Sequence, residues 1–192
     1  MTEKVDGFYS VERDPRVRPH WMLGTLASPA EEWVNPSLFT SGRRAQPILD
    51  LNVPIEIRGK EVDFNFCHSL VVVTASRFNA AIESIDGSAI QRIPVEVDGN
   101  RTAYEILNVC KLVACFDEER SVFQKWSEED SRPEKVGKLE MVVDLKIDRA
   151  AATGHDIFRV AEWPLALIIS ERMKSAFEKF RVTGVRYERV DS

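Results

Sequence analysis

The sequence predicts an α+β fold: a mixed, mostly antiparallel sheet with two strand-helix-strand units and an irregular N-terminal lobe. Three observations lead to this expectation. Near the C-terminus, an apolar run typical of a buried strand is followed at once by an amphipathic helix and an alternating strand. A similar pattern occurs about 95 positions earlier. Between residues 20 and 54, by contrast, prolines and glycines interrupt any regular period.

The C-terminal unit spans residues 165–190. Residues 165–169 form an apolar run that is too short for an independent helix. Ser170 offers a hydroxyl N-cap, and Glu171 and Lys179 place negative and positive charge where the helix dipole favours each. We therefore expect a helix over 171–180, closely followed by Gly184 in a left-handed conformation and by a strand over 185–190.

The first unit repeats this arrangement. An apolar run at 70–73 precedes a helix that ends near Gly87, and a strand over 90–97 follows. The apolar stripes of the two helices have the same spacing of i, i+3, i+4 and i+7: Phe78, Ala81, Ile82 and Ile85 in one, and Met173, Ala176, Phe177 and Phe180 in the other. The likeness has two possible explanations: a true duplication, or the general similarity of any two strand-helix-strand units. Either way, we expect the two helices to pack on a shared sheet.

The remaining elements follow in chain order. Strands are expected over 7–13, 48–57, 62–67, 104–109, 111–116 and 139–147. Those at 48–57 and 62–67 are expected to pair around the turn at 58–60, and 98–100 carries a hairpin turn signal. Residues 123–137 are expected to form an exposed loop anchored by Trp126. We expect one domain over 1–192, with the irregular lobe at 1–48 and the core at 49–192.

Composition narrows the class of protein. The chain has 192 residues, of which 44% are hydrophobic and 30% charged, as in an ordinary globular domain. It contains no apolar run of about 18 residues, and its N-terminus does not resemble a signal peptide, so we expect a cytoplasmic location. The net charge of −5 disfavours binding to nucleic acid or to an anionic membrane and favours a basic protein partner.

Residues that carry chemistry do not form any recognised site. The three cysteines, Cys67, Cys110 and Cys115, lie in apolar, strand-like contexts and are expected to be reduced and buried. The three histidines are scattered, and the cysteine spacing is not that of a zinc site. The glycines form no phosphate-binding loop or nucleophile elbow. We therefore predict no catalytic residues, no metal site and no cofactor.

Two acidic runs and three aromatic residues are the candidates for partner contact. The candidates are Asp117, Glu118 and Glu119, Glu128, Glu129 and Asp130, and the tryptophans Trp21, Trp33 and Trp126. Runs of carboxylates are usually solvated surface, and each tryptophan is more often a cover for the core than a partner contact. However, Trp is also favoured at the centre of protein interfaces.

Several short motifs resemble one known family. They are the strand 104–109 with its Asn108, Asp117 with Ser121 four residues on, Phe158-Arg159, Ser170-Glu171 at a strand-to-helix junction, and a closing Thr183-Gly184-Val185. In this order, from about residue 49 to 190, they resemble family eleven of the immunity proteins of bacterial polymorphic toxin systems, formerly a domain of unknown function. The N-terminal lobe is only loosely similar.

The resemblance implies a small intracellular protein that binds and neutralises a cognate toxin encoded nearby, without catalysis or a cofactor. The acidic charge is suited to attracting a basic toxin domain, and with a nuclease toxin the carboxylates would imitate phosphates. Among the motif residues, we expect Phe158 to pack in the core, Arg159 to pair with an internal carboxylate and Ser170 to cap a helix. Asn108 and Asp117 either satisfy backbone groups or line a cleft.

Two other classes remain open. A hydrolase-like enzyme would gather polar side chains around one cleft, for which the candidates are Asn108, Asp117, Ser121, His155 and Arg159. A structural or regulatory module would instead associate with a second copy of itself through an apolar patch.

Overall fold

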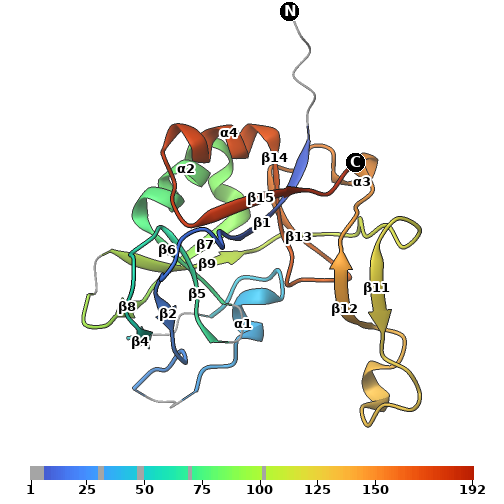
Figure 1. Cartoon of the computed structure of the whole chain (residues 1–192), viewed down its shortest axis with the longest axis horizontal. Helices are drawn as coiled ribbons and strands as arrows, with labels where there is room; N and C mark the ends of the chain where they lie inside the picture. Colours follow the sequence, from blue (N-terminus) through green and yellow to red (C-terminus); the bar gives the residue numbers. More distant parts are fainter. Residues whose placement is uncertain (1–6, 30–32, 47–49, 69–70, 101–102) are drawn as a thin grey trace, which may run out of the picture.

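Two antiparallel sheets form the body of the protein (Figure 1). The computed structural model describes residues 7–29, 33–46, 50–68, 71–100 and 103–192. One sheet has the strand order β5 (Phe64–Phe66), β6 (Val72–Ala75), β9 (Tyr104–Val109), β7 (Ile90–Pro94). The other has the order β10 (Leu112–Val113), β13 (Ile157–Val160), β14 (Leu167–Ser170), β1 (Phe8–Arg13), β15 (Val185–Arg189). Apart from the parallel pair β10 and β13, all their pairings are antiparallel, which confirms the α+β class.

Two helices of the body pack against each other. Helix α2 (Ser76–Asp86), which continues into the short 3₁₀ helix η2 (Gly87–Ala89), and helix α4 (Glu171–Lys179) meet through the expected apolar stripes. The ring centroids of Phe78 and Phe177 are 4.5 Å apart. The expected shared sheet is wrong, however, because β6 and β7 belong to one sheet whereas β14 and β15 belong to the other. The helix pair joins the two sheets instead.

The two halves have the same topology. In each, a strand leads directly into a helix and then into a second, parallel strand, and one antiparallel strand lies between the two: β9 between β6 and β7, and β1 between β14 and β15. Strands β5 and β13 take equivalent places beside β6 and β14. This correspondence favours duplication. The central strand differs in origin, since β9 follows its own unit whereas β1 comes from the start of the chain.

An ion pair recurs at the same place in both halves. Asp63, just before β5, binds Arg77 in the first turn of α2, with 2.7 Å between Oδ2 and Nη2. Asp156, just before β13, binds Arg172 in the first turn of α4. In each half the backbone carbonyl of the aspartate also accepts the N–H of the residue before the helix, at 2.9 and 3.0 Å. Each aspartate therefore fixes the junction between a strand and a helix.

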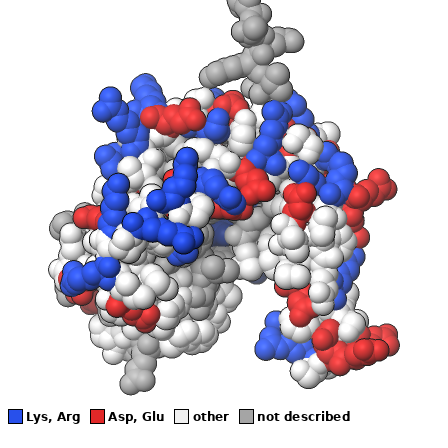
Figure 2. Space-filling model, viewed as in Figure 1, with Lys and Arg blue, Asp and Glu red and all other residues white. Residues whose placement is uncertain are grey.

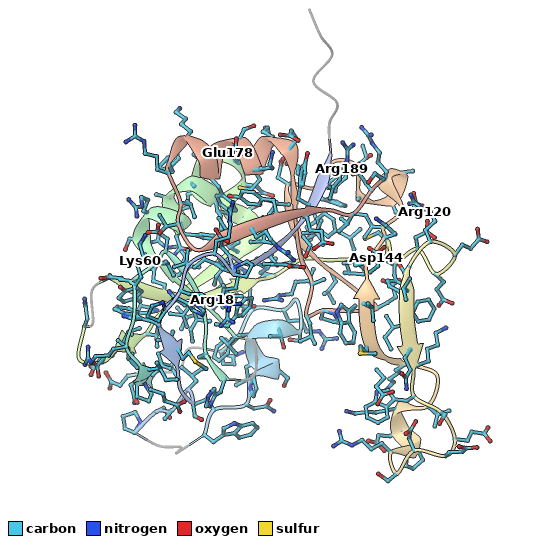
Figure 3. The ribbon with its side chains drawn as sticks, in the orientation of Figure 1. Arg18, Lys60, Arg120, Asp144, Glu178 and Arg189 are labelled. Atoms are coloured by element: carbon cyan, nitrogen blue, oxygen red, sulfur yellow. The ribbon has the colours of Figure 1, made fainter. Side chains whose placement is uncertain are left out.

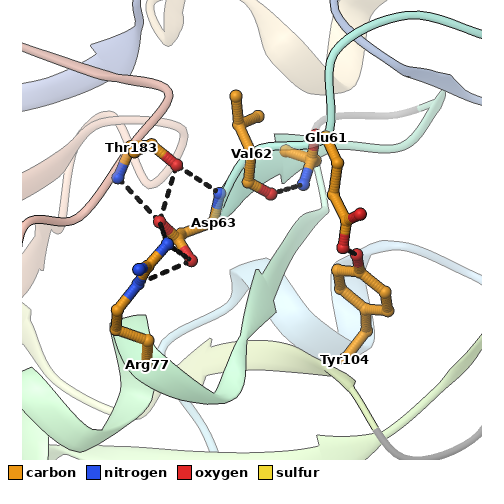
Figure 4. Close-up of polar contacts among 7 residues, drawn as sticks. Glu61, Val62, Asp63, Arg77, Tyr104 and Thr183 are labelled. Atoms are coloured by element: carbon orange, nitrogen blue, oxygen red, sulfur yellow. Dashed lines mark hydrogen bonds and ion pairs between the residues drawn. The ribbon is translucent and has the colours of Figure 1, made fainter.

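Asp63 also holds the C-terminal half of the chain (Figure 4). Its Oδ2 accepts hydrogen bonds from the backbone N–H and the hydroxyl of Thr183, at 2.8 and 2.6 Å. The next residue, Gly184, has φ +84°, and a Cβ there would lie 2.8 Å from Val62. Gly184 thus has the positive φ that was expected shortly after the helix, although Arg181 is the first residue with a left-handed conformation after α4. Gly184 also allows close contact with Val62.

The N-terminal lobe covers the outer face of the four-stranded sheet. Its short elements are β2 (Met22–Leu23) and α1 (Ser37–Thr40), which are joined by β3 (Asn52–Val53), β4 (Ile55–Ile57) and β8 (Glu96–Val97) from the expected core. Strand β4 pairs with β2, and β3 pairs with β8, so the expected hairpin around 58–60 is wrong. The reason lies at Lys60, whose N–H donates to the carbonyl of Pro19 at 2.8 Å and ties the turn to the preceding lobe.

A hairpin projects from the body on the opposite side from β2 and β4 (Figure 1). We call residues 117–146 the arm. It contains β11 (Val122–Lys125), the 3₁₀ helix η3 (Pro133–Lys135) and β12 (Leu139–Asp144). The expected loop over 123–137 is therefore correct only in part: residues 123–125 belong to β11, whereas 126–137 form turns and irregular structure around η3. Apolar and polar residues alternate along 139–147, but the apolar residues are not consistently the buried ones, because irregularities interrupt the β11–β12 register. Met141 and Val143 are 48% and 69% exposed.

Helix α3 (Arg149–Ala152) connects the arm to β13, and the Asp148 carboxylate caps it by accepting the N–H of Ala150. Within the described ranges, none of the helices has the length and apolar character needed to span a bilayer.

We predict that Gly184→Ala destabilises the protein more than Gly154→Ala. Gly154 has φ +87° but nothing within 4 Å of the added Cβ, so both substitutions cost about 1–2 kcal/mol of backbone strain. Only Gly184→Ala adds overpacking against Val62, worth about 1–3 kcal/mol more. Urea unfolding followed by circular dichroism measures the difference. Equal losses in the two variants would contradict the tight contact.

Candidate functional site

The arm brings together the two acidic runs, one at its base and one near its tip. Figure 3 shows Arg120 and Asp144 at the base, where β12 ends and the chain enters the body. Residues 117–146 contain nine acidic and six basic residues, so the arm carries more than half of the net charge of −5. The negatively charged surface of the arm is therefore suited to a basic partner.

The base of the arm is fixed by two of the motif residues. The Asp117 carboxylate accepts the N–H and Nε of Arg120, at 3.0 and 2.7 Å, and these hydrogen bonds hold the pKa of Asp117 below its usual value. The Ser121 hydroxyl donates to the carbonyl of Lys146 and accepts its N–H at 2.9 Å. Asp117 and Ser121 therefore satisfy backbone groups and join the two sides of the arm.

The remaining carboxylates of the runs are more open. Glu118 is exposed and pairs with Lys125 at 2.9 Å, while Asp130 accepts two hydrogen bonds from Ser127 in the turn near the tip. Glu119, Glu128 and Glu129 are exposed, and the described part of the chain shows no ion pair to any of them. These three side chains are the carboxylates best placed to meet a partner.

The three tryptophans have different surroundings. The Trp21 ring lies 5.6 Å from that of Tyr104 and helps to cover the core. Trp126 is half-buried on the arm, with the cationic groups of Arg132 and Lys135 over its ring. Trp33 is 55% exposed, so the favoured interpretation as a core cover is wrong there.

A groove separates part of the arm from the body, visible as a gap in the space-filling view (Figure 2). It consists of two hollows of about 580 and 290 Å³ that share Trp163 and Leu165, from the connection between β13 and β14. Trp126 and Leu139 line the larger hollow on the arm side, and Val142 and Val143 line the smaller one, opposite β1 and β15. We call this feature the arm groove.

The arm groove was not expected from the sequence. In the sequence, Trp163 precedes an apolar run and Leu165 begins it, and this pattern does not predict their exposure. Leu165, predicted as the first residue of a buried strand, is 42% exposed, because β14 begins at Leu167.

Of the five polar residues considered for an enzyme cleft, Asp117 and Ser121 are neighbours at the base of the arm, and the other three occupy separate places. Asn108 is buried in β9, where its Nδ2 donates to the Arg43 carbonyl at 2.8 Å and to Gln91 Oε1 at 3.0 Å, so that it holds the chain near residue 43 against the sheet. His155 lies by another hollow, beside Asp156, and burial lowers its pKa. Among the described contacts, only Asp117 and Ser121 join two members of the set.

Arg159 is buried without the internal carboxylate that we expected. It is 1% exposed, and its Nη1 donates to the carbonyl of Pro164 at 2.7 Å. Among the described residues, its Nε and Nη2 have no hydrogen-bond partner. Burial lowers its pKa to about 10, so the side chain remains charged at neutral pH. Its neighbour Phe158 packs in the core as predicted.

The cysteines are free thiols. Cys67 and Cys115 are buried as expected, whereas Cys110 is half-buried. Burial raises the pKa of Cys67 to about 11 and that of Cys115 to about 12, so neither forms a nucleophilic thiolate at neutral pH. Across the described ranges, no three potential metal ligands converge.

Most motif residues thus have contacts that stabilise the fold, while exposed apolar and acidic side chains lie around the arm groove. This arrangement is typical of a protein that acts by binding another protein. The comparison of families agrees: the chain belongs to the immunity protein family Imm11, which matches residues 25–192. The match begins well before residue 49 and so includes much of the N-terminal lobe. No curated protein matches the chain.

We predict an acid-dependent contribution from Asp156. Burial alone would raise its pKa, but hydrogen bonds from Arg172 and Ser170 outweigh burial and hold the pKa below the usual 3.8. As pH falls below 3.8, the unfolded chain takes up this proton first, so the stabilisation present at higher pH is lost as pH falls through the folded pKa. Asp156→Asn should therefore cost about 1–2 kcal/mol at pH 7 and progressively less below pH 3.8.

Urea unfolding of both proteins between pH 7 and pH 2.5 measures this difference. The exposed Glu119→Gln serves as the control and should change stability little. A loss in Asp156→Asn that stays constant throughout this range would contradict the assignment.

Proposed function

We propose that this chain binds a cognate toxin domain in the cytoplasm of the producing cell and blocks its activity by direct contact, without catalysis or a cofactor. The observation that carries the proposal is membership of the immunity protein family over residues 25–192. The separate locations of Asn108, His155 and Arg159 also favour binding over catalysis, because a catalytic site needs convergent polar groups.

Electrostatics supports a basic toxin. The chain has a net charge of −5, and the exposed carboxylates of the two acidic runs that form no ion pair with a described residue, Glu119, Glu128 and Glu129, lie on the arm. A surface of this kind attracts a positively charged partner and accelerates association. If the toxin is a nuclease, its positively charged substrate site would accept these carboxylates in place of phosphates.

Growth of a bacterial host tests the proposal. The host expresses the C-terminal toxin domain encoded beside this chain, with or without the chain itself, and the two proteins are then co-purified. Restored growth together with a stable complex is the expected result. If the toxin domain remains lethal in the presence of the folded chain, the proposed pairing is wrong.

We predict that replacing the open carboxylates of the arm slows binding to the toxin domain. The triple variant Glu119→Gln, Glu128→Gln, Glu129→Gln should lower the association rate constant about tenfold at low salt, because attraction between charges steers the encounter. Asp117 is left intact, since it holds Arg120 at the base of the arm. Surface plasmon resonance at several salt concentrations measures the change.

The control is a triple variant with the same change in net charge on other surfaces: Glu56→Gln, Glu83→Gln, Glu178→Gln. Equal slowing in both variants would assign the effect to net charge and not to the arm. An association rate that does not depend on salt would show that steering is absent.

A further inference from the structure

We infer that the arm groove receives an extended, apolar segment of the toxin domain, which adds to the free edge of β12 as a third strand. The inference rests on the proposed function and goes beyond it, because it names the surface and the mode of binding.

Exposed apolar side chains gather at this groove. Val143 on β12 is 69% exposed and Leu165 is 42% exposed, and both line the hollows. Trp163 is half-buried and belongs to the wall that the two hollows share. Single exposed apolar residues are common on protein surfaces, but a group of them around one concavity indicates an interaction site.

Strand β12 offers main-chain hydrogen-bonding groups along the same groove. In the described part of the chain it pairs with β11 alone, and β12 is the strand of the arm that lies nearer to the body (Figure 1). Proteins usually protect such an edge with proline, central charges or a covering element. Residues 139–144 contain no proline, and their charges are confined to Glu140 and Asp144. The edge is therefore suited to strand addition.

The arm itself would gain from a third strand. An isolated two-stranded ribbon is marginally stable in water, since it buries little apolar surface. The arm is anchored at its base by the Ser121 and Lys146 hydrogen bonds and by the contact of Phe116 with Phe123, whose ring centroids are 5.2 Å apart. Beyond this base, an added strand would bury Val143 and pair the edge of β12.

Charge favours a toxin segment over a second copy of this chain. Two copies would each bring a net charge of −5, and each arm has nine acidic against six basic residues, so they would repel. A basic domain that presents an apolar strand would complement both the apolar groove and the surrounding carboxylates. We therefore assign the groove to an apolar strand flanked by basic residues.

Uncharged substitutions test the groove with matched controls. Val143→Gln and Leu165→Gln each remove an apolar contact in the groove without changing net charge. Ile57→Gln and Met22→Gln also replace an exposed apolar side chain without changing net charge, but on the paired strands β4 and β2, on the opposite side of the body. These two side chains are 50% and 42% exposed. Because all four side chains are exposed, folding should persist, and circular dichroism with urea unfolding verifies this.

Calorimetry with the purified toxin domain measures affinity. We expect each groove variant to bind about tenfold more weakly, the double variant to bind more weakly still, and both controls to bind like the wild type. Hydrogen exchange should show that amides of β12 become protected in the complex.

Three outcomes would overturn the inference. Suppose that the wild type binds the toxin domain and restores growth of the host. If the groove variants then bind like the controls, and the β12 amides exchange in the complex as they do in the free protein, the groove is not the binding surface. If sedimentation shows that the chain alone is a dimer and the groove variants make it monomeric, the occupant is a second copy. If the wild type does not bind the toxin domain at all, the proposed function fails first.

Discussion

The buried carboxylate of Asp63 is the interaction on which the arrangement of the two halves depends. Its side chain is 6% exposed and accepts hydrogen bonds from Arg77, on α2, and from the backbone and hydroxyl of Thr183, before β15 (Figure 4). A buried charge is tolerated only when such partners replace its hydration. Asp63 thereby orients both the helix of the first half and the last strand of the second.

The position of β15 determines much of the second half. Strand β15 pairs with β1, and β1 pairs with β14, so both ends of the chain are needed to complete the five-stranded sheet. The connection from β13 to β14 leaves this sheet and carries Trp163 and Leu165, which form the wall of the arm groove. The candidate binding surface is therefore positioned by the five-stranded sheet, and residues of the paired strands β1 and β15 supply part of its lining.

The motifs that point to the immunity protein family contribute mainly to stability. Asn108 holds the chain near residue 43, Asp117 and Ser121 fix the base of the arm, and the Ser170 hydroxyl caps α4. Gly184 allows close contact with Val62. The residues that mark the family and the residues that form the binding surface are consequently different sets. The family residues stabilise the fold, whereas the binding surface consists of side chains that the fold leaves exposed.

The sequence by itself determined the local elements: helices α2 and α4, the strand-to-helix junctions and the strand at 104–109, because capping groups and apolar periodicity act over a few residues. Only the tertiary structure decided which strands pair, since the separation of the two sheets and the placement of β1 depend on contacts between distant segments. It likewise decided that Val143 and Leu165 are exposed while Arg159 is buried. A side chain's type states what it prefers, but its exposure depends on what the rest of the chain places against it.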